Sequence, residues 1–205
     1  MVRRRGEGGG IYLTTTGIDV RHAQVQLGLD RIREGDVILV SGPVGDHGIA
    51  ALLAREQFGL SGELQSDAAS VFSLAQALLP LDGLRFMRDP TRGGLATVMH
   101  EICRAADMQA LLQQPAIPVR EQVNSVCEML GYDPIYLACE GRLVAVLDAA
   151  QADAALAALQ ALPQGQDVAR IGSVQAGREQ VVLETEFGGQ RILEELEDDP
   201  LSRIC

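Results

Sequence analysis

The sequence predicts an α+β fold in which helices cover a mixed β-sheet. Helical and strand-like segments alternate along most of the chain, and 47% of the 205 residues are hydrophobic. The last two strand-like segments, 167–174 and 180–193, follow one another with no helix between them, which disfavours a fully parallel, doubly wound sheet. This composition is sufficient for the core of one domain, or of one domain with part of another.

The periodicity of apolar residues predicts each element in turn. Strands are expected at 11–20, 34–42, 83–89, 108–119, 142–148, 167–174 and 180–193. Helices are expected at 49–59, 67–81, 95–107, 120–131 and 150–162. Pro115 and Pro118 should end the strand that contains them. We therefore divide the chain into an isolated strand with a linker (1–30), an α+β domain (31–193) and an acidic, flexible tail (194–205).

The charge of the chain argues against some partners. There are 17 Lys and Arg residues against 28 Asp and Glu residues, so the formal net charge is −11. A nucleic-acid backbone would be repelled by most of such a surface. No apolar run is long enough for a membrane span and no secretion signal is visible, so we expect no membrane partner and a cytoplasmic location.

The last residue of the chain is a cysteine. The four cysteines lie far apart without a C-x-x-C pair, which predicts neither a metal site nor a disulfide framework. Cys103, Cys127 and Cys139 are interpreted as packed, inert thiols. Cys205 instead ends a mobile stretch of about ten residues that reaches roughly 30 Å, with Arg203 as the nearby cation that favours a thiolate. An accidental exposed cysteine is the alternative.

Two glycine-containing loops each precede an expected helix. In "DPTRGGLATV", Asp89 or Thr91 would cap the helix and Gly93 and Gly94 would allow close packing, and this interpretation is favoured. The alternative is an anion site at the start of the helix, which Arg92 supports.

The loop "GPVGDHG" contains Asp46 and His47 between a strand and a helix. A tight turn capped by Asp46 is favoured over a nucleotide contact, because the loop lacks the Gly-Lys-Ser/Thr ending of a Walker motif. In "LACEGRLVAV", Glu140 is either an ordinary turn residue or a carboxylate placed in a cleft.

Taken together, several motifs resemble one family. "GDHGIA", "RDPTRGGLATVMHEI", "AIPVREQV", "ACEGRLVAV" and the final "RIC" are similar, in this order, to hydrogenase maturation proteins of the HypE family, from about residue 11 to residue 205. That family belongs to a wider group of ATP-using enzymes that resemble aminoimidazole ribonucleotide synthetase, selenophosphate synthetase and thiamine-monophosphate kinase. These enzymes have two α/β domains and are usually dimers.

The resemblance implies that the terminal cysteine is itself a substrate. HypF would carbamoylate Cys205, and ATP with Mg²⁺ would drive dehydration to a thiocyanate. The cyano group would pass to a HypC–HypD complex for the iron of a nickel–iron hydrogenase. Glu140 matches the family's glutamate before its "G-[KR]-L-V" strand and is our choice for the base. The loops with Asp46, His47, Asp89, Thr91, Arg92, Gly93 and Gly94 would border the nucleotide or the tail channel.

The chain departs from the family in two ways. Ser202 stands where the family usually has a proline before its Arg-Ile-Cys ending. In addition, residues 1–30 align with the last strand and linker of the family's amino-terminal ATP-binding domain, so we expect this chain to be inactive by itself. The alternatives are a carboxy-terminal domain of a selenophosphate synthetase-like or kinase-like enzyme, and a non-catalytic docking module.

Overall fold

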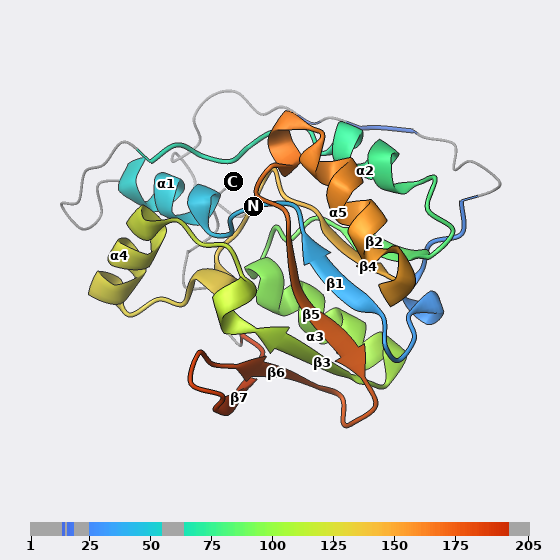
Figure 1. Ribbon diagram of the computed structural model, residues 1–205. Coiled ribbons are helices and arrows are strands. Elements are labelled where there is room, and N and C mark those ends of the chain that lie inside the picture. Colours follow the sequence, from blue (N-terminus) through green and yellow to red (C-terminus); the bar gives the residue numbers. More distant parts are fainter. Residues whose placement is uncertain (1–13, 15, 19–24, 55–63, 197–205) are drawn as a thin grey trace.

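A seven-stranded mixed sheet forms the centre of the computed structural model, which describes residues 14, 16–18, 25–54 and 64–196 (Figure 1). The strands are β1 (Val37–Val40), β2 (Leu84–Arg88), β3 (Gln109–Gln113), β4 (Val144–Leu147), β5 (Ala169–Gln175), β6 (Gln180–Glu184) and β7 (Gln190–Leu193). Their order across the sheet is β2-β4-β1-β5-β3-β6-β7. Only the β3–β6 pair is parallel among these neighbours. The predicted α+β fold with a mixed sheet is confirmed.

Helices cover both faces of this sheet. They are α1 (Asp46–Ala54), α2 (Phe72–Leu78), α3 (Gly94–Ala106), α4 (Glu121–Leu130) and α5 (Ala152–Gln160). Strand β1 alternates between the two faces: Ile38 and Val40 belong to the core cluster that contains α3, whereas Val37 and Leu39 belong to the cluster that contains α2 and α5. Helices α1 and α4 pack together through a third, smaller cluster at one end of the molecule (Figure 1).

Three expected elements differ from the observed ones. The strand expected at 108–119 is limited to Gln109–Gln113, and a 3-10 helix at Gln114–Ala116 follows it. The helix expected at 67–81 is limited to Phe72–Leu78, because the preceding loop lies against Gly141 and the side chain of Asp67 is fixed there. The single strand expected at 180–193 is a hairpin of β6 and β7. Its turn is closed by a hydrogen bond from Thr185 N–H to Gly189 O and contains Gly188 at a φ of 75°. The strand expected at 11–20 falls largely outside the described residues.

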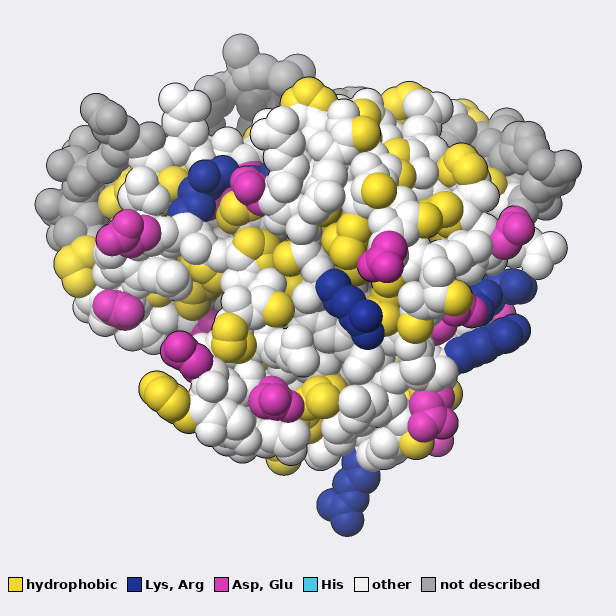
Figure 2. Space-filling model, viewed as in Figure 1, with side chains coloured by type: hydrophobic (Ala, Val, Ile, Leu, Met, Phe, Trp, Pro, Cys, Tyr) yellow, Lys and Arg dark blue, Asp and Glu magenta, His cyan; other side chains and the backbone are white. Residues whose placement is uncertain are grey.

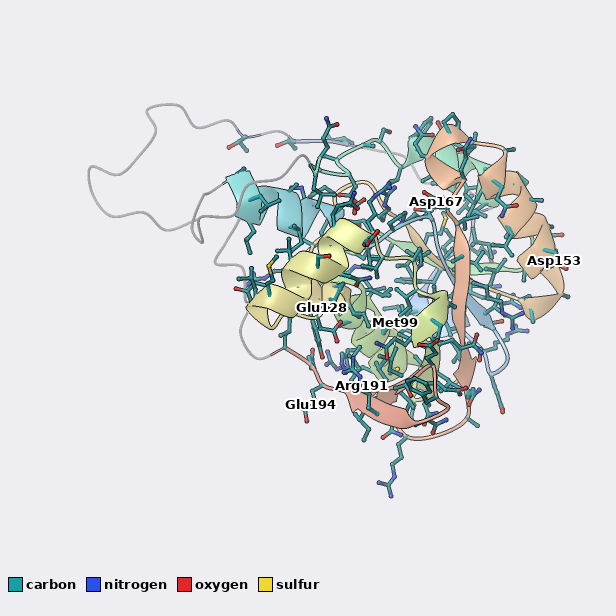
Figure 3. The ribbon with its side chains drawn as sticks, turned by 60° about the vertical axis from the view of Figure 1, so that its left-hand side comes forward. Met99, Glu128, Asp153, Asp167, Arg191 and Glu194 are labelled. Carbon is teal, nitrogen blue, oxygen red and sulfur yellow. The ribbon has the colours of Figure 1, made fainter. Side chains whose placement is uncertain are left out.

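The described surface mixes charged and apolar side chains. Acidic and basic groups are interspersed on the face in Figure 2, where the coloured residues form no continuous basic patch. Figure 3 shows Met99, a fully buried residue of α3, near the centre of the molecule and Asp153 of α5 at its outer edge. Within the described part of the chain, no helix combines the length and the apolar content that a membrane span requires.

Candidate functional site

Three loops that the sequence singled out meet at Cys139. The N–H of Cys139 donates a hydrogen bond to the carbonyl oxygen of Pro90 at 3.0 Å, which fixes the "DPTRGG" loop. The thiol of the same residue accepts a hydrogen bond from Gly45 N–H at 3.4 Å, which fixes the "GPVGDHG" loop. The segment before Glu140 is therefore the common contact of both glycine loops.

The start of α3 is packed too tightly for any residue but glycine. Gly94 has a φ of 58°, and a Cβ atom there would lie 2.6 Å from the carbonyl oxygens of Ile135 and Leu137. The helix begins after Gly93, and no side chain of the described residues caps it, so the expected cap by Asp89 or Thr91 is wrong. The glycine pair does serve close packing.

The polar residues of this loop remain on the outside. Asp89 and Arg92 are exposed and Thr91 is half-buried, next to the start of a helix of 13 residues. The first backbone N–H groups of such a helix carry partial positive charge, which favours an anion at that end of a helix.

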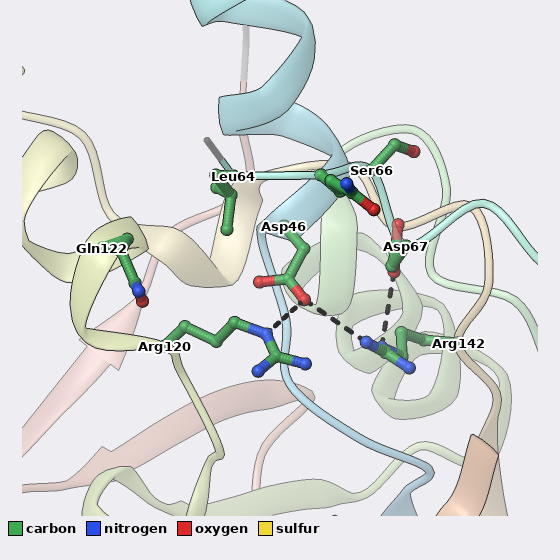
Figure 4. Close-up of a pocket in the computed structure, with 8 residues that line it drawn as sticks. Asp46, Leu64, Ser66, Asp67, Arg120, Gln122 and Arg142 are labelled. Atoms are coloured by element: carbon green, nitrogen blue, oxygen red, sulfur yellow. Dashed lines mark hydrogen bonds and ion pairs between the residues drawn. The ribbon is translucent and has the colours of Figure 1, made fainter. Parts of the chain in front are cut away.

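Asp46 lies at the centre of an ion-pair network that the sequence did not reveal. Its carboxylate oxygen Oδ2 accepts hydrogen bonds from Arg120 Nε at 2.9 Å and from Arg142 at 3.3 Å (Figure 4). Arg142 Nε also lies 3.4 Å from Oδ2 of Asp67. Asp46 is the first residue of α1 and is only 2% exposed, and its other oxygen has no hydrogen-bond donor among the residues that the structure describes. Asp46 thus pairs with arginines, which corrects the expectation that it mainly caps a turn.

The network lines a cavity of about 500 Å³. The lining residues are Asp46, Leu64, Gln65, Ser66, Asp67, Arg120, Gln122 and Arg142. Two aspartates and two arginines of the lining balance one another in formal charge. Both carboxylates are buried and paired with arginines, whereas Arg120 is 45% exposed.

His47 and Glu140 lie beside this cavity. Nδ1 of the half-buried His47 is 2.8 Å from the hydroxyl oxygen of Ser66. The backbone N–H of Glu140 donates to Oδ1 of Asp67 at 3.1 Å, while its side chain is exposed. Within the described residues the exposed side chain of Glu140 agrees with an ordinary turn residue, the first of the two alternatives, and not with a carboxylate placed in a cleft.

The three described cysteines are buried thiols, as expected. Burial raises the pKa of Cys103 and of Cys127 to about 11 and that of Cys139 to about 12. Such thiols are protonated and unreactive near neutral pH. Cys205, Arg203 and Ser202 lie outside the described residues.

The described residues contain no group of three or more His, Cys, Asp or Glu side chains placed to hold a metal ion. Mg²⁺ is often held by one or two carboxylates together with substrate phosphates. A Mg²⁺ ion at this site would consequently depend on a nucleotide or on residues beyond the described ones for most of its ligands.

The mixed sheet and the loops that meet at Cys139 define a carboxy-terminal domain of the aminoimidazole ribonucleotide synthetase type. Residues 33–184 match the family described as "AIR synthase related protein, C-terminal domain", and the chain belongs to this family.

Within this class, the chain is similar to HypE proteins. It is 45% identical over 206 residues to carbamoyl dehydratase HypE of Cupriavidus necator, covering 100% of this chain and 59% of the relative. A crystal structure of hydrogenase maturation protein HypE in complex with ATP superimposes with a TM-score of 0.79 at 43% identity, over 85% of this chain and 54% of the other. The crystal structure of a HypE–HypF complex matches with a TM-score of 0.80 at 34% identity, over 83% and 56%. The resemblance seen in the sequence is confirmed, and the chain spans about three fifths of the length of this curated relative.

Proposed function

We propose that this chain is the carboxy-terminal part of a HypE-type carbamoyl dehydratase, whose substrate is its own last residue, Cys205. The observation that carries the proposal is the meeting of the "GPVGDHG", "DPTRGG" and "ACEG" loops at Cys139, next to Glu140. These are the segments through which the sequence resembles the family. The HypE–ATP structure, at 43% identity, supports ATP as the co-substrate.

The reaction converts a thiocarbamate on the cysteine sulfur into a thiocyanate. The group S–C(=O)–NH₂ loses its oxygen and both nitrogen-bound protons and becomes S–C≡N, while ATP becomes ADP and phosphate. An amide oxygen is a poor leaving group, and transfer of the γ-phosphoryl group of ATP turns it into phosphate. In this proposal Glu140 removes a proton from nitrogen, which is the work of a general base.

The described residues suggest how the site is divided. The start of α3, with Asp89, Thr91, Arg92, Gly93 and Gly94, would border the phosphates of ATP, with Mg²⁺ held mainly by those phosphates.

The charge-balanced cavity next to Asp46 and His47 would border the tail channel, since a carbamoyl group is uncharged and carries both N–H donors and a carbonyl acceptor. Closing the site excludes water from the phosphorylated intermediate.

The proposal also names partners. HypF would supply the carbamoyl group, in line with the HypE–HypF complex at 34% identity. A HypC–HypD complex in the cytoplasm would accept the cyano group for a nickel–iron hydrogenase, and the whole enzyme would be a homodimer. The amino-terminal ATP-binding domain of the family would complete the site, so this chain alone should not dehydrate its tail.

Intact-mass measurement of the peptide that contains Cys205 tests this function. The chain is incubated with HypF, carbamoyl phosphate and ATP, and then with ATP and the part of the Cupriavidus necator relative that the chain does not match. We expect a gain of one carbamoyl group in the first step and the loss of one water in the second. Cys205→Ser should abolish both steps and Glu140→Gln only the second. Dehydration by the chain alone would contradict the expected inactivity, and an unmodified Cys205 would contradict the function.

A further inference from the structure

Asp67 is a buried carboxylate in a loop whose neighbouring side chains are mostly exposed. Its side chain has 0% exposure, whereas Gln65, Ser66 and Ala68 are all exposed. Burying the charge of an aspartate costs free energy unless hydrogen bonds and opposite charges offset the loss of hydration. Here Oδ1 accepts the N–H of Glu140, and Oδ2 faces the guanidinium of Arg142 at 3.4 Å without receiving a hydrogen bond from any described residue.

The backbone of the same loop presses directly on the residue after Glu140. A Cβ atom on Gly141 would lie 1.9 Å from the carbonyl oxygen of Asp67, so only glycine fits. Asp67 therefore holds the Glu140–Gly141 peptide from two directions, by a hydrogen bond and by contact.

Arg142 connects this contact to the opposite loop. Its Nε donates to the carbonyl oxygen of Pro43 at 2.8 Å, and a terminal nitrogen lies 3.3 Å from Asp46 Oδ2. Its side chain is 11% exposed. Because a guanidinium is planar and has five donors in fixed directions, one side chain sets the spacing of three oxygen atoms from two loops.

We propose that Asp67 and Arg142 are positioning residues that fix the backbone of Glu140 and so aim its carboxylate at the reacting nitrogen. This inference rests on the proposed role of Glu140 as the base. An exposed side chain on a loop has little else to orient it, and a displacement of about 1 Å in a catalytic group can cost roughly 100-fold in rate. Cys139, the residue before Glu140, is held by its hydrogen bonds with Pro90 and Gly45, so the backbone of the base is held on both sides.

The chain offers a matched control in Arg85. Its side chain is 10% exposed and lies 3.6 Å from Asp36 and 3.1 Å from Asp148, so it is also a buried arginine between two carboxylates. Arg85 and Arg142 lie at opposite ends of β4. Arg85 follows Leu84, which pairs with Leu147 at the end of β4, whereas Arg142 precedes Val144, the first residue of β4. Arg142→Lys and Arg85→Lys remove equivalent guanidinium contacts, and only the first affects Glu140.

Two measurements test the proposal. The first is amide hydrogen exchange at Glu140 in the chain itself, where Asp67→Ala and Arg142→Lys should speed exchange and Arg85→Lys should not. The second is the single-turnover rate constant of thiocyanate formation from carbamoylated Cys205, with the unmatched part of the Cupriavidus necator relative supplied. A loss of folded protein lowers the amplitude of a single turnover, whereas a misplaced base lowers its rate constant.

We expect Asp67→Ala and Arg142→Lys to lower the rate constant by about 100-fold, and Arg85→Lys to leave it within about twofold. Asp67→Asn keeps an oxygen for the N–H of Glu140 and should recover part of the loss. If Glu140→Gln abolishes the reaction while Asp67→Ala leaves the rate constant unchanged, the positioning role is wrong and the proposed function stands. If Glu140→Gln has no effect, the assignment of the base is wrong, whatever Asp67 does to amide exchange.

Discussion

Replacing Gly94 by alanine should destabilise the protein through a specific contact. The residue has a φ of 58°, and the added Cβ would lie 2.6 Å from the carbonyl oxygens of Ile135 and Leu137. The left-handed conformation costs alanine about 1–2 kcal/mol, and overpacking of a tight contact costs about 1–3 kcal/mol. We expect the free energy of unfolding to fall by about 3 kcal/mol, which corresponds to a Tm lower by about 6–12 °C for a domain of this size.

Gly131→Ala is the matched control for this prediction. Gly131 has a φ of 72°, but a Cβ atom there would meet no atom of the described residues within 4 Å, so only the conformational cost applies. Urea and thermal unfolding followed by circular dichroism measure both variants. Gly94→Ala should be less stable than Gly131→Ala by at least about 1 kcal/mol. Equal losses would refute the close approach of α3 to the segment before Cys139.

Two further predictions concern the thiols. Iodoacetamide at neutral pH should modify Cys205 and spare Cys103, Cys127 and Cys139. The reason is that only a thiolate reacts, and burial raises the pKa of these three thiols to about 11 or 12. Peptide mass mapping checks this, and rapid labelling of the folded protein at Cys139 would contradict it. Between about pH 9 and 11 the unfolded thiols lose protons that the native ones keep, so stability should fall as pH rises, by up to about 1.4 kcal/mol per pH unit for each buried thiol. Urea unfolding measured across this pH range should show that the free energy of unfolding falls less steeply with pH in Cys103→Ala than in the unchanged protein. An equal pH dependence in the two proteins would count against the raised pKa of Cys103.

Local patterns in the sequence were sufficient for most of the elements. The helix expected at 95–107 is found at Gly94–Ala106, because apolar residues at helical spacing form one buried stripe against the sheet. Strand 34–42 was recognised from its continuous apolar run, and β1 is indeed buried on both faces. The helix expected at 67–81 was too long, because the apolar pattern does not show that Asp67 is fixed by partners about seventy residues away.

The sequence by itself determined the class of fold, the acidic charge and the glycine loops, because these depend on composition and on the spacing of near neighbours. It also placed a cysteine at the end of the chain. Only the tertiary structure decided that Asp46, Asp67, Arg120 and Arg142 form one network. The antiparallel register that pairs Val40 with Val144 brings the loop after β1 against the residues before β4, and such long-range pairing leaves no local signal in the chain.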